Sequence, residues 1–288
     1  MRTLRQKMLE DLELRNRSAI TQQCYLRGVR QFVEYCGGRP PAKLGEPEIR
    51  QFLLHLVNER GVSPATHHQR VAALRFFYLV TLRRPAAVAR IPFPKVPRTL
   101  PEILSGSEVE RLLGCITSIK YRTVCSVAYG AGLRIHEATS LRPADIDSVR
   151  GLIHIREGKG KKDREVLLGE RLLQTLREYW RTCRPRGEWL FPSNDSPDRP
   201  VNVRTVRDAL YQAAKAARLK RKVTPHLLRH SFATHMLEMG HDPRLIQLLL
   251  GHSSFRSTQR YTQLRAEYLR RIKGPFELLD KPEGQILR

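Results

Sequence analysis

A proline-rich segment between residues 83 and 107 constrains the fold of this chain more than any other feature. Five prolines lie within seventeen residues there: Pro85, Pro92, Pro94, Pro97 and Pro101. Proline at that density prevents helix formation and favours an extended, semi-rigid backbone, so we expect two domains joined by a tether. A chain of 288 residues is long enough to build two hydrophobic cores. We place the first domain at residues 1–88, the linker at 89–104 and the second domain at 105–288.

The first part of the sequence predicts a small bundle of helices. Ser18 can cap a helix that runs to Cys36, where two glycines follow. Apolar residues at helical spacing then mark the inner face of a second helix: Ile49, Phe52, Leu53, Leu56 and Val57. A third helix is expected from Ser63 to about Leu82. Its inward-facing residues would be Val71, Leu74, Phe77 and Tyr78.

The second part predicts a mixed, mainly helical domain. Helices are expected at about 107–115, 120–132, 135–142, 170–183, 202–218, 225–239 and 243–250. Two short strands, at 151–156 and 163–168, would form a hairpin around the glycine-bearing segment 157–162. Gly240 and Gly251 stand where helices commonly end. The expected fold class is therefore mainly α, with a small antiparallel β-sheet in the second domain.

The charge of the chain indicates its partner. It has 52 Lys and Arg residues against 28 Asp and Glu residues, a formal net charge of +24. Both sides of residue 90 carry a basic excess, so nucleic acid is the leading partner and salt should weaken its binding. An anionic membrane surface ranks far behind, because no basic amphipathic helix flanks an apolar anchor. The basic linker suits a tether that wraps around a duplex, and equally a plain connection between two basic domains.

The cysteines and histidines do not indicate a metal site. The five cysteines include no C-x-x-C pair, which is typical of a protein that folds in a reducing compartment, and we expect a cytoplasmic location. His230, His235 and His241 lie close together in the sequence, but no H-E-x-x-H pattern accompanies them. We therefore expect no metal, no cofactor and no small-molecule substrate. No apolar run approaches the ~18–20 residues of a membrane span.

Five motifs follow one another in the second part of the chain. They are Gly132-Leu-Arg134-Ile-His-Glu137, Gly158-Lys159-Gly160, His226-Leu-Leu-Arg229-His230, Leu250-Gly-His252 and Tyr261. This ordered set resembles the tyrosine recombinases, and it is most similar to the bacterial Xer-like and integrase branch. The resemblance covers residues from about 105 to 265. The helical first part and its linker fit the SAM-like core-binding domain of that family.

The resemblance assigns two arginines and a histidine to one phosphate. Cleaving a phosphodiester without a metal requires donors that neutralise charge on the non-bridging oxygens. Arg134 and Arg229 would clamp these oxygens with paired N–H donors. His226 lies one helical turn before Arg229, on the same face, where it can point at the same phosphate. His252 is implied to share its role in hydrogen bonding and proton handling.

The resemblance also implies a nucleophile, an acid and supporting residues. Tyr261 would attack phosphorus and form a 3′-phosphotyrosine, while Lys159 would protonate the departing 5′ oxygen. Lys161 and Lys162 are two and three residues away, so the hairpin could instead be merely basic and touch the DNA backbone. Glu137 would support Arg134, and His230 together with Ser231 would support Arg229 by packing. His136 departs from the family, which often has a small residue there.

At the level of the whole protein, the resemblance implies a site-specific DNA recombinase. Its two domains would close as a C-shaped clamp on double-stranded DNA that carries specific recombination sites. A homotetramer on two sites would exchange strands through a Holliday junction, for the integration, excision or resolution of a mobile element. The enzyme would act on the bacterial nucleoid. The 27 residues after Tyr261 could form a helix that docks on a neighbouring subunit.

Three other functions remain to be compared with this one. A type IB topoisomerase-like enzyme would use the same chemistry as a monomer, but the short chain and the hairpin-to-tyrosine spacing favour a recombinase. A catalytically inactive DNA-binding regulator is disfavoured because every catalytic position is filled. A metal-dependent nuclease is disfavoured because clustered carboxylates are lacking.

Overall fold

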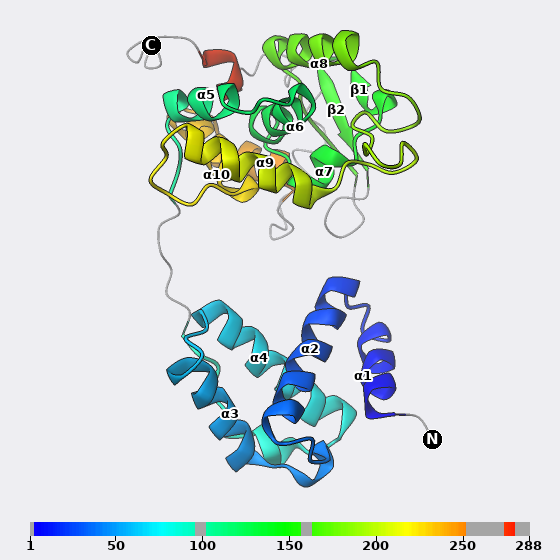
Figure 1. Ribbon diagram of the computed structural model, residues 1–288, viewed down its shortest axis with the longest axis vertical. Coiled ribbons are helices and arrows are strands. Elements are labelled where there is room, and N and C mark those ends of the chain that lie inside the picture. Colours follow the sequence, from blue (N-terminus) through cyan, green and yellow to red (C-terminus); the bar gives the residue numbers. More distant parts are fainter. Residues whose placement is uncertain (1–2, 96–101, 157–162, 252–273, 280–288) are drawn as a thin grey trace. The chain divides into compact units, whose positions relative to one another are not determined.

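The computed structural model describes residues 3–95, 102–156, 163–251 and 274–279 (Figure 1). The chain divides into two compact units, Met1–Leu100 and Pro101–Arg288, which we call the first and the second unit. The structure is mainly helical with a small antiparallel sheet in the second unit, which confirms the expected fold class. Within the described ranges, every helix is too short or too polar to cross a bilayer.

The first unit is built from helices whose starts are set by capping side chains. The helices are α1 (Leu4–Glu13), α2 (Ala19–Tyr35), α3 (Glu46–Asn58) and α4 (Pro64–Phe76), and α4 continues into a π-helical turn, η2 (Phe77–Thr81). Short 3-10 turns occupy Pro41–Lys43 and Pro85–Val88. Ser18 and Ser63 accept the N–H groups of Thr21 and Thr66, each at 3.3 Å, as N-caps do.

The core of the first unit forms where α2 crosses α4. Gly28 lets the two helices approach, because a Cβ at this position would lie 3.0 Å from the Cβ of Ala73. The rings of Phe32 and Phe52 pack 5.5 Å apart between centroids, and the core continues along the chain to Ile91. The inward residues expected for the third helix are all buried. Val57 was expected inside and is 44% exposed, because it lies at the edge of the apolar face of α3.

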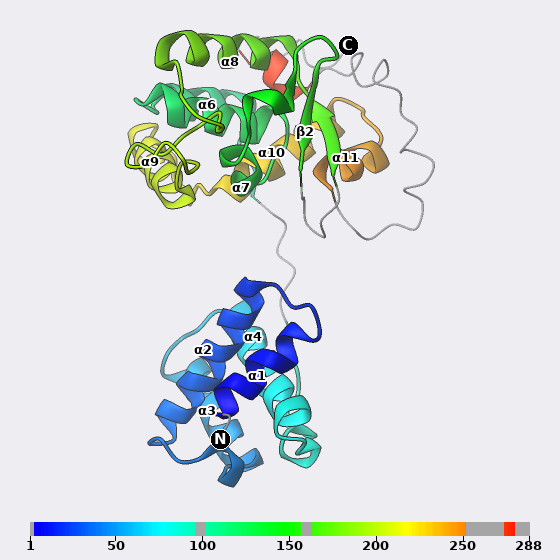
Figure 2. The same cartoon turned by 90° about the vertical axis from the view of Figure 1, so that its right-hand side faces the viewer.

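The second unit combines helices with a three-stranded sheet. Its helices are α5 (Gly106–Gly114), α6 (Ile119–Gly130), α7 (Ile135–Thr139), α8 (Glu170–Cys183), α9 (Val203–Ala216), α10 (Pro225–Glu238) and α11 (Pro243–Leu250). The 3-10 turns are η4 (Pro143–Asp145) and η6 (Pro275–Leu278). The strands are β1 (Ile146–Asp147), β2 (Leu152–Ile155) and β3 (Arg164–Leu167), paired antiparallel in that order. Figure 2 shows β2 and its neighbours beside α11, and α11 contacts β3.

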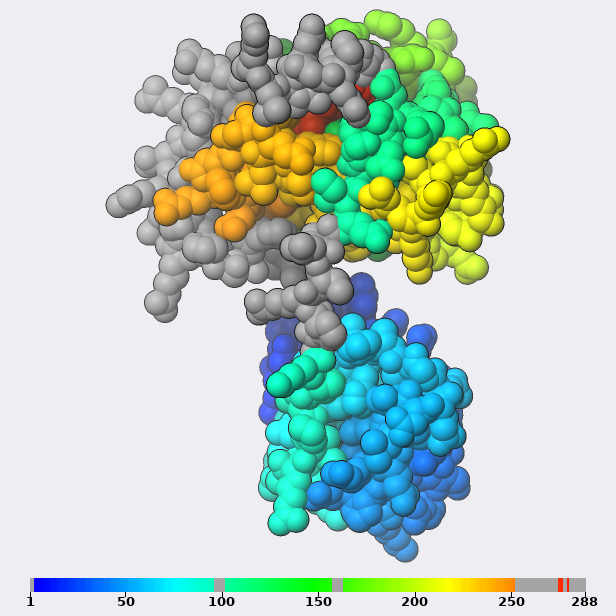
Figure 3. Space-filling view, turned by 90° about the vertical axis from the view of Figure 1, so that its left-hand side faces the viewer, coloured from blue at the N-terminus to red at the C-terminus, as the bar shows by residue number. Residues whose placement is uncertain are grey.

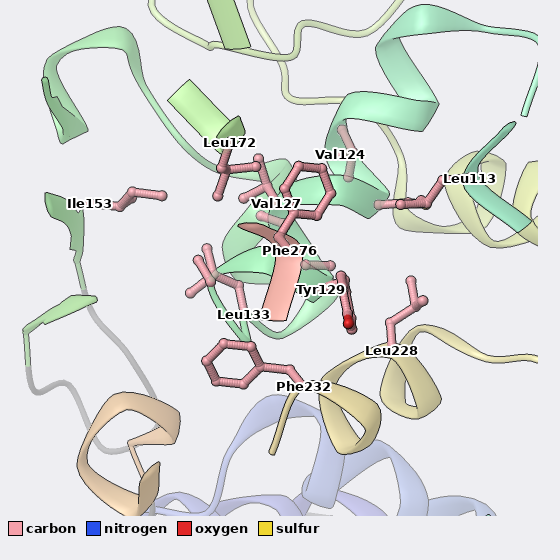
Figure 4. Packing of buried hydrophobic residues seen from close by; sticks show 14 of the residues in the cluster. Leu113, Val124, Val127, Tyr129, Leu133, Ile153, Leu172, Leu228, Phe232 and Phe276 are labelled. Atoms are coloured by element: carbon pink, nitrogen blue, oxygen red, sulfur yellow. The ribbon is translucent and has the colours of Figure 1, made fainter. Parts of the chain in front are cut away.

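Helix α6 forms the centre of the second unit. All residues from Thr123 to Gly130 are buried, and α8, α9 and α10 pack around them. Figure 4 shows Tyr129 and Val127 of α6 among Phe276, Leu228 and Phe232. In Figure 3 the red atoms of η6 lie beside the orange α10–α11 region and the blue-green start of the unit. This part of the tail, expected to dock on a neighbouring subunit, therefore packs against its own unit, with the Phe276 ring 6.2 Å from that of Tyr129.

Candidate active site

Helix α10 positions two of the residues expected at the site. The helix begins with Pro225 after Thr224, whose hydroxyl accepts the N–H of Leu227 at 3.3 Å. His226 and Arg229 follow three residues apart and so lie on one side of the helix. The side chain of His226 is exposed, while that of Arg229 is only 6% exposed. A buried arginine requires acceptors around it, and the chain supplies them from two distant segments.

Two carbonyl groups hold the buried guanidinium of Arg229. Its Nη1 donates to the carbonyl of Gly132 at 2.9 Å, and its Nη2 donates to the carbonyl of Leu250. Gly132 adopts a φ of +63°, and a Cβ there would lie 2.5 Å from Cδ1 of Phe232. Only glycine satisfies both conditions without a clash. The glycine of the Gly132–Glu137 motif therefore places a carbonyl where Arg229 needs an acceptor.

Arg134 and Glu137 are joined at the start of α7. Glu137 accepts the backbone N–H of Arg134 through Oε2 and the Arg134 Nη1 through Oε1, both at 2.8 Å. The side chain of Arg134 remains 23% exposed, so the group is fixed at one end and open to solvent. His136 is exposed and makes neither of these bonds. Its departure from the family pattern leaves the Arg134–Glu137 pair in place.

A third arginine, Arg164 at the start of β3, completes the cluster. Its Nη1 and Nη2 donate to Oε1 and Oε2 of Glu137 at 2.9 and 2.8 Å, and its Nε donates to the carbonyl of Leu249 at 3.0 Å. The side chain is only 10% exposed. Sequence reasoning missed this residue, because it follows a run of basic hairpin residues and its carboxylate partner is 27 positions away.

The cluster concentrates positive charge. Arg229 also approaches Glu137, with 3.7 Å between Nη1 and Oε2, so three arginines surround one carboxylate. Burial alone would raise the pKa of Glu137, but the bonds from Arg164 and from the N–H of Arg134 outweigh it and hold that pKa at about 2. Burial and the nearby Arg134 lower the pKa of Arg229 to about 10, which leaves it protonated at neutral pH. Two positive charges are therefore in excess.

His226 lies within reach of this field. Although His226 is exposed to solvent, partial desolvation of its imidazole, followed by the charges of His230, Arg229 and Arg134, lowers its pKa. A lowered pKa favours the neutral imidazole, which can both donate and accept a hydrogen bond. An arrangement of this kind, with guanidinium groups in excess beside an imidazole, can bind a tetrahedral anion, because the arginines supply charge-assisted donors.

Of the remaining predicted residues, the structure describes some and not others. His230 is exposed, and the hydroxyl of Ser231 donates to the carbonyl of Leu227 and accepts the N–H of Leu104, both at 2.9 Å. Gly251 ends α11 with a φ of +62°, the left-handed conformation expected there. Lys159, His252 and Tyr261 lie outside the described residues. Across the part of the chain that is described, no group of three or more His, Cys, Asp or Glu residues could hold a metal ion.

Comparisons with known proteins show which family the chain belongs to. The model of the phage integrase family matches residues 102–267, and that of the phage integrase N-terminal SAM-like domain matches residues 4–87. A putative integrase/recombinase of Sinorhizobium fredii is 46% identical over 98% of this chain and 91% of its own length. The tyrosine recombinase XerA of Thermococcus kodakarensis is 37% identical over 95% of both chains.

Solved structures share the fold. A lambda integrase dimer bound to a COC′ core site superposes with a TM-score of 0.73 at 19% identity, over 87% of this chain and 94% of that one. This structural likeness shows the fold, whereas the family models and the sequence relatives show the family. The chain therefore belongs to the phage integrase family of tyrosine recombinases, and it is a site-specific DNA recombinase.

Proposed function

We propose that this enzyme breaks and rejoins DNA through a covalent bond between Tyr261 and the 3′ phosphate at its recombination site. The observation that carries the proposal is the cluster in which Arg134, Arg164 and Arg229 surround Glu137 and leave two positive charges in excess. A phosphodiester at this cluster would meet guanidinium groups that are already oriented, so charge developing on its oxygens is stabilised without reorganisation.

Each residue of the motifs then receives a role. Arg134 and Arg229 bind the non-bridging oxygens, and the neutral imidazole of His226 hydrogen-bonds the same phosphate, with His252 as a second such group. Tyr261 attacks phosphorus and passes its phenolic proton to one of these histidines, while Lys159 protonates the 5′ oxygen as its bond to phosphorus breaks. Because the tyrosyl ester retains the energy of the broken bond, the 5′ hydroxyl of another strand can restore the phosphodiester without ATP. No metal takes part in this scheme.

Two residues support these groups. Glu137 holds Arg134 by its backbone and its side chain. His230, which directly follows Arg229 on α10, would support that arginine by packing. The observed bonds of Ser231 to Leu227 and Leu104 stabilise α10 in the same region.

The same proposal covers the handling of the DNA. Residues 1–88 would form the core-binding domain, residues 89–104 the linker and residues 105–288 the catalytic domain, closing as a C-shaped clamp on the duplex. Four copies on two sites would exchange strands through a Holliday junction. The reaction would integrate, excise or resolve a mobile element in the bacterial cytoplasm. The basic charge on both parts of the chain supports a long contact with the phosphate backbone.

A nicked substrate tests the proposal. Duplexes that carry the sequences flanking the gene are given a nick next to the cleavage point, so that the freed fragment diffuses away and the covalent complex accumulates. With EDTA present, the wild type should form a protease-sensitive protein–DNA adduct, while Tyr261→Phe should bind the same DNA and form none. An adduct with Tyr261→Phe would place the nucleophile elsewhere.

The same experiment separates the other functions. A topoisomerase-like enzyme would also relax supercoiled plasmids that lack the site. An inactive regulator would bind without forming an adduct, and a metal-dependent nuclease would cut only when EDTA is absent.

A further inference from the structure

Arg164 belongs to none of the five motifs, yet its side chain donates more hydrogen bonds than that of Arg134 or Arg229. Its fork donates to both carboxylate oxygens of Glu137, at 2.9 and 2.8 Å, and its Nε donates to the carbonyl of Leu249. A bidentate bond of this kind fixes the plane of the carboxylate as well as its position. All three guanidinium nitrogens of Arg164 already donate to protein acceptors, so the side chain acts within the protein.

The contacts of Arg164 join three segments that carry site residues. Arg164 begins β3, directly after the hairpin segment that contains Lys159. Its bonds to Glu137 connect it to Arg134, which donates to the same carboxylate. At Leu249 it holds the end of α11, where a Cβ on Gly251 would lie 3.1 Å from Cδ and Nε of Arg164. The guanidinium therefore packs against Gly251, the residue that precedes His252 in the sequence.

The hydrogen bonds of Glu137 show what Arg164 contributes to the charge of the site. An ionised carboxylate offers about four acceptor positions. Here Oε1 accepts from Arg134 and Arg164 side chains, and Oε2 accepts from Arg164 and from the backbone N–H of Arg134. The carboxylate is therefore saturated. Arg229 stays 3.7 Å away, beyond hydrogen-bond distance, and binds carbonyl groups instead.

We propose that Arg164 is a positioning residue that keeps Glu137 saturated and thereby keeps Arg134 and Arg229 available to the DNA phosphate. Without Arg164, two acceptor positions of a buried carboxylate would open beside Arg229 Nη1. Glu137 would then compete with the phosphate for the same donors. This inference rests on the proposed function, because it presupposes that the two arginines bind a phosphate.

Single-turnover cleavage of the nicked substrate at saturating protein tests the inference. Arg164→Ala should lower the cleavage rate about 10- to 100-fold, the range expected when a catalytic group is displaced by a remote change, with little change in DNA affinity. Arg164→Lys should recover only part of the rate, because a single ammonium cannot reproduce the bidentate fork. Arg150→Ala is the matched control, since Arg150 pairs with Asp147 and Glu165 near the same sheet, and it should cleave within about threefold of wild type.

A double-mutant cycle with Glu137→Gln distinguishes positioning from general support of the fold. If Arg164 acts by occupying the carboxylate, removing Arg164 from a Glu137→Gln protein should change the rate less than threefold, because no charged competitor remains. Equal fold-losses in both backgrounds would overturn the inference. Melting curves identify any variant that fails to fold, and the Arg164→Lys cycle then replaces the Arg164→Ala cycle.

A second substrate locates the step that Arg164 affects. A 5′-bridging phosphorothiolate releases a thiolate that needs no proton, so it should rescue Lys159→Ala and should not rescue Arg164→Ala. Rescue of Arg164→Ala would mean that Arg164 serves the acid on the hairpin, and the inference would be wrong. An unreactive wild type would instead contradict the proposed function. An active wild type with an equally active Arg164→Ala would overturn the inference alone.

Discussion

The two units of this protein use arginine in different ways. In the first unit, each buried or half-buried arginine donates to uncharged oxygen atoms, and no two of the arginines described next share an acceptor. Arg70 donates to Gln31 at 2.8 Å, and Arg75 donates to the carbonyls of Val88 and Ile91 at 2.8 and 2.9 Å. In the second unit, three arginines converge on Glu137. Arginine side chains thus link chain segments in the first unit, whereas in the second unit they concentrate positive charge around one carboxylate.

If the cluster binds the scissile phosphate as proposed, the difference between the units explains how a very basic chain can select one phosphate. A net charge of +24 attracts DNA to the protein as a whole, but spread charges do not select one phosphate. Convergence does, because several fixed donors then act on the same atoms. The cluster also leaves Arg134 partly open to solvent, whereas Arg70 is buried and its bonds go to glutamine side chains.

The largest expected effect comes from exchanging arginine for lysine in each unit. Arg134→Lys and Arg229→Lys should each lower single-turnover cleavage about 10²–10³-fold, because a point charge cannot supply the paired donors that stabilise the transition state. Arg70→Lys should leave the cleavage rate within about threefold and lower the free energy of unfolding by about 1 kcal/mol. If the lysine variants of the second unit cleave as fast as wild type, those arginines are ordinary structural residues and the comparison fails.

A smaller effect, on the free energy of unfolding, is expected at two glycines with positive φ, one in each unit. Gly132→Ala adds a Cβ 2.5 Å from the ring of Phe232 at a φ of +63°, so it should lower the free energy of unfolding by about 3 kcal/mol. Gly61→Ala, at a φ of +55° with nothing within 4 Å, should lower it by only about 1 kcal/mol. Urea unfolding followed by circular dichroism measures both. Equal losses would show that close packing at Gly132 adds no strain.

The motifs of the site were readable from the sequence because their members lie close together along the chain. Arg134 with Glu137, and His226 with Arg229, are each three residues apart on a helix, and their order matched a known family. Arg164 was not readable, since its bond to Glu137 spans 27 residues, and the bond from Arg229 to Gly132 spans 97. Local periodicity carries no information about such distant contacts.

The fold shows the same limit. Helices with clear caps and apolar stripes were predicted within a few residues, including α2 after Ser18 and α11 before Gly251. Helix α1 was missed because it buries only Met8 and Leu12, too few residues to display a stripe. Strand β1 is two residues long and exists through its pairing with β2. Elements that depend on their partners cannot be recognised from their own sequence.

The smallest effect in this comparison concerns pH. The pKa of Glu137 is lowered to about 2, so the ionised group stabilises the fold fully above the unfolded pKa of about 4.3, and this stabilisation is lost as pH falls towards 2. At pH 7 the wild type should be more stable than Glu137→Gln by about 2 kcal/mol, and the gap should narrow below about pH 4.5. Tryptophan fluorescence reports this in the second unit, which contains both tryptophans, Trp180 and Trp189. A gap that is independent of pH would contradict the assignment of the charge to Glu137.

The most direct test of the account removes the charge of the scissile phosphate and compares how much each arginine then contributes to the rate. A methylphosphonate at the scissile position has one fewer negative non-bridging oxygen, so it should depend less on the excess charge of the cluster. We expect Arg134→Ala and Arg229→Ala to lose about 10²–10³-fold in the rate of covalent adduct formation on ordinary DNA, and at least tenfold less than that on the methylphosphonate. Equal losses on both substrates would mean that the arginines do not neutralise the phosphate, and the central claim would be wrong.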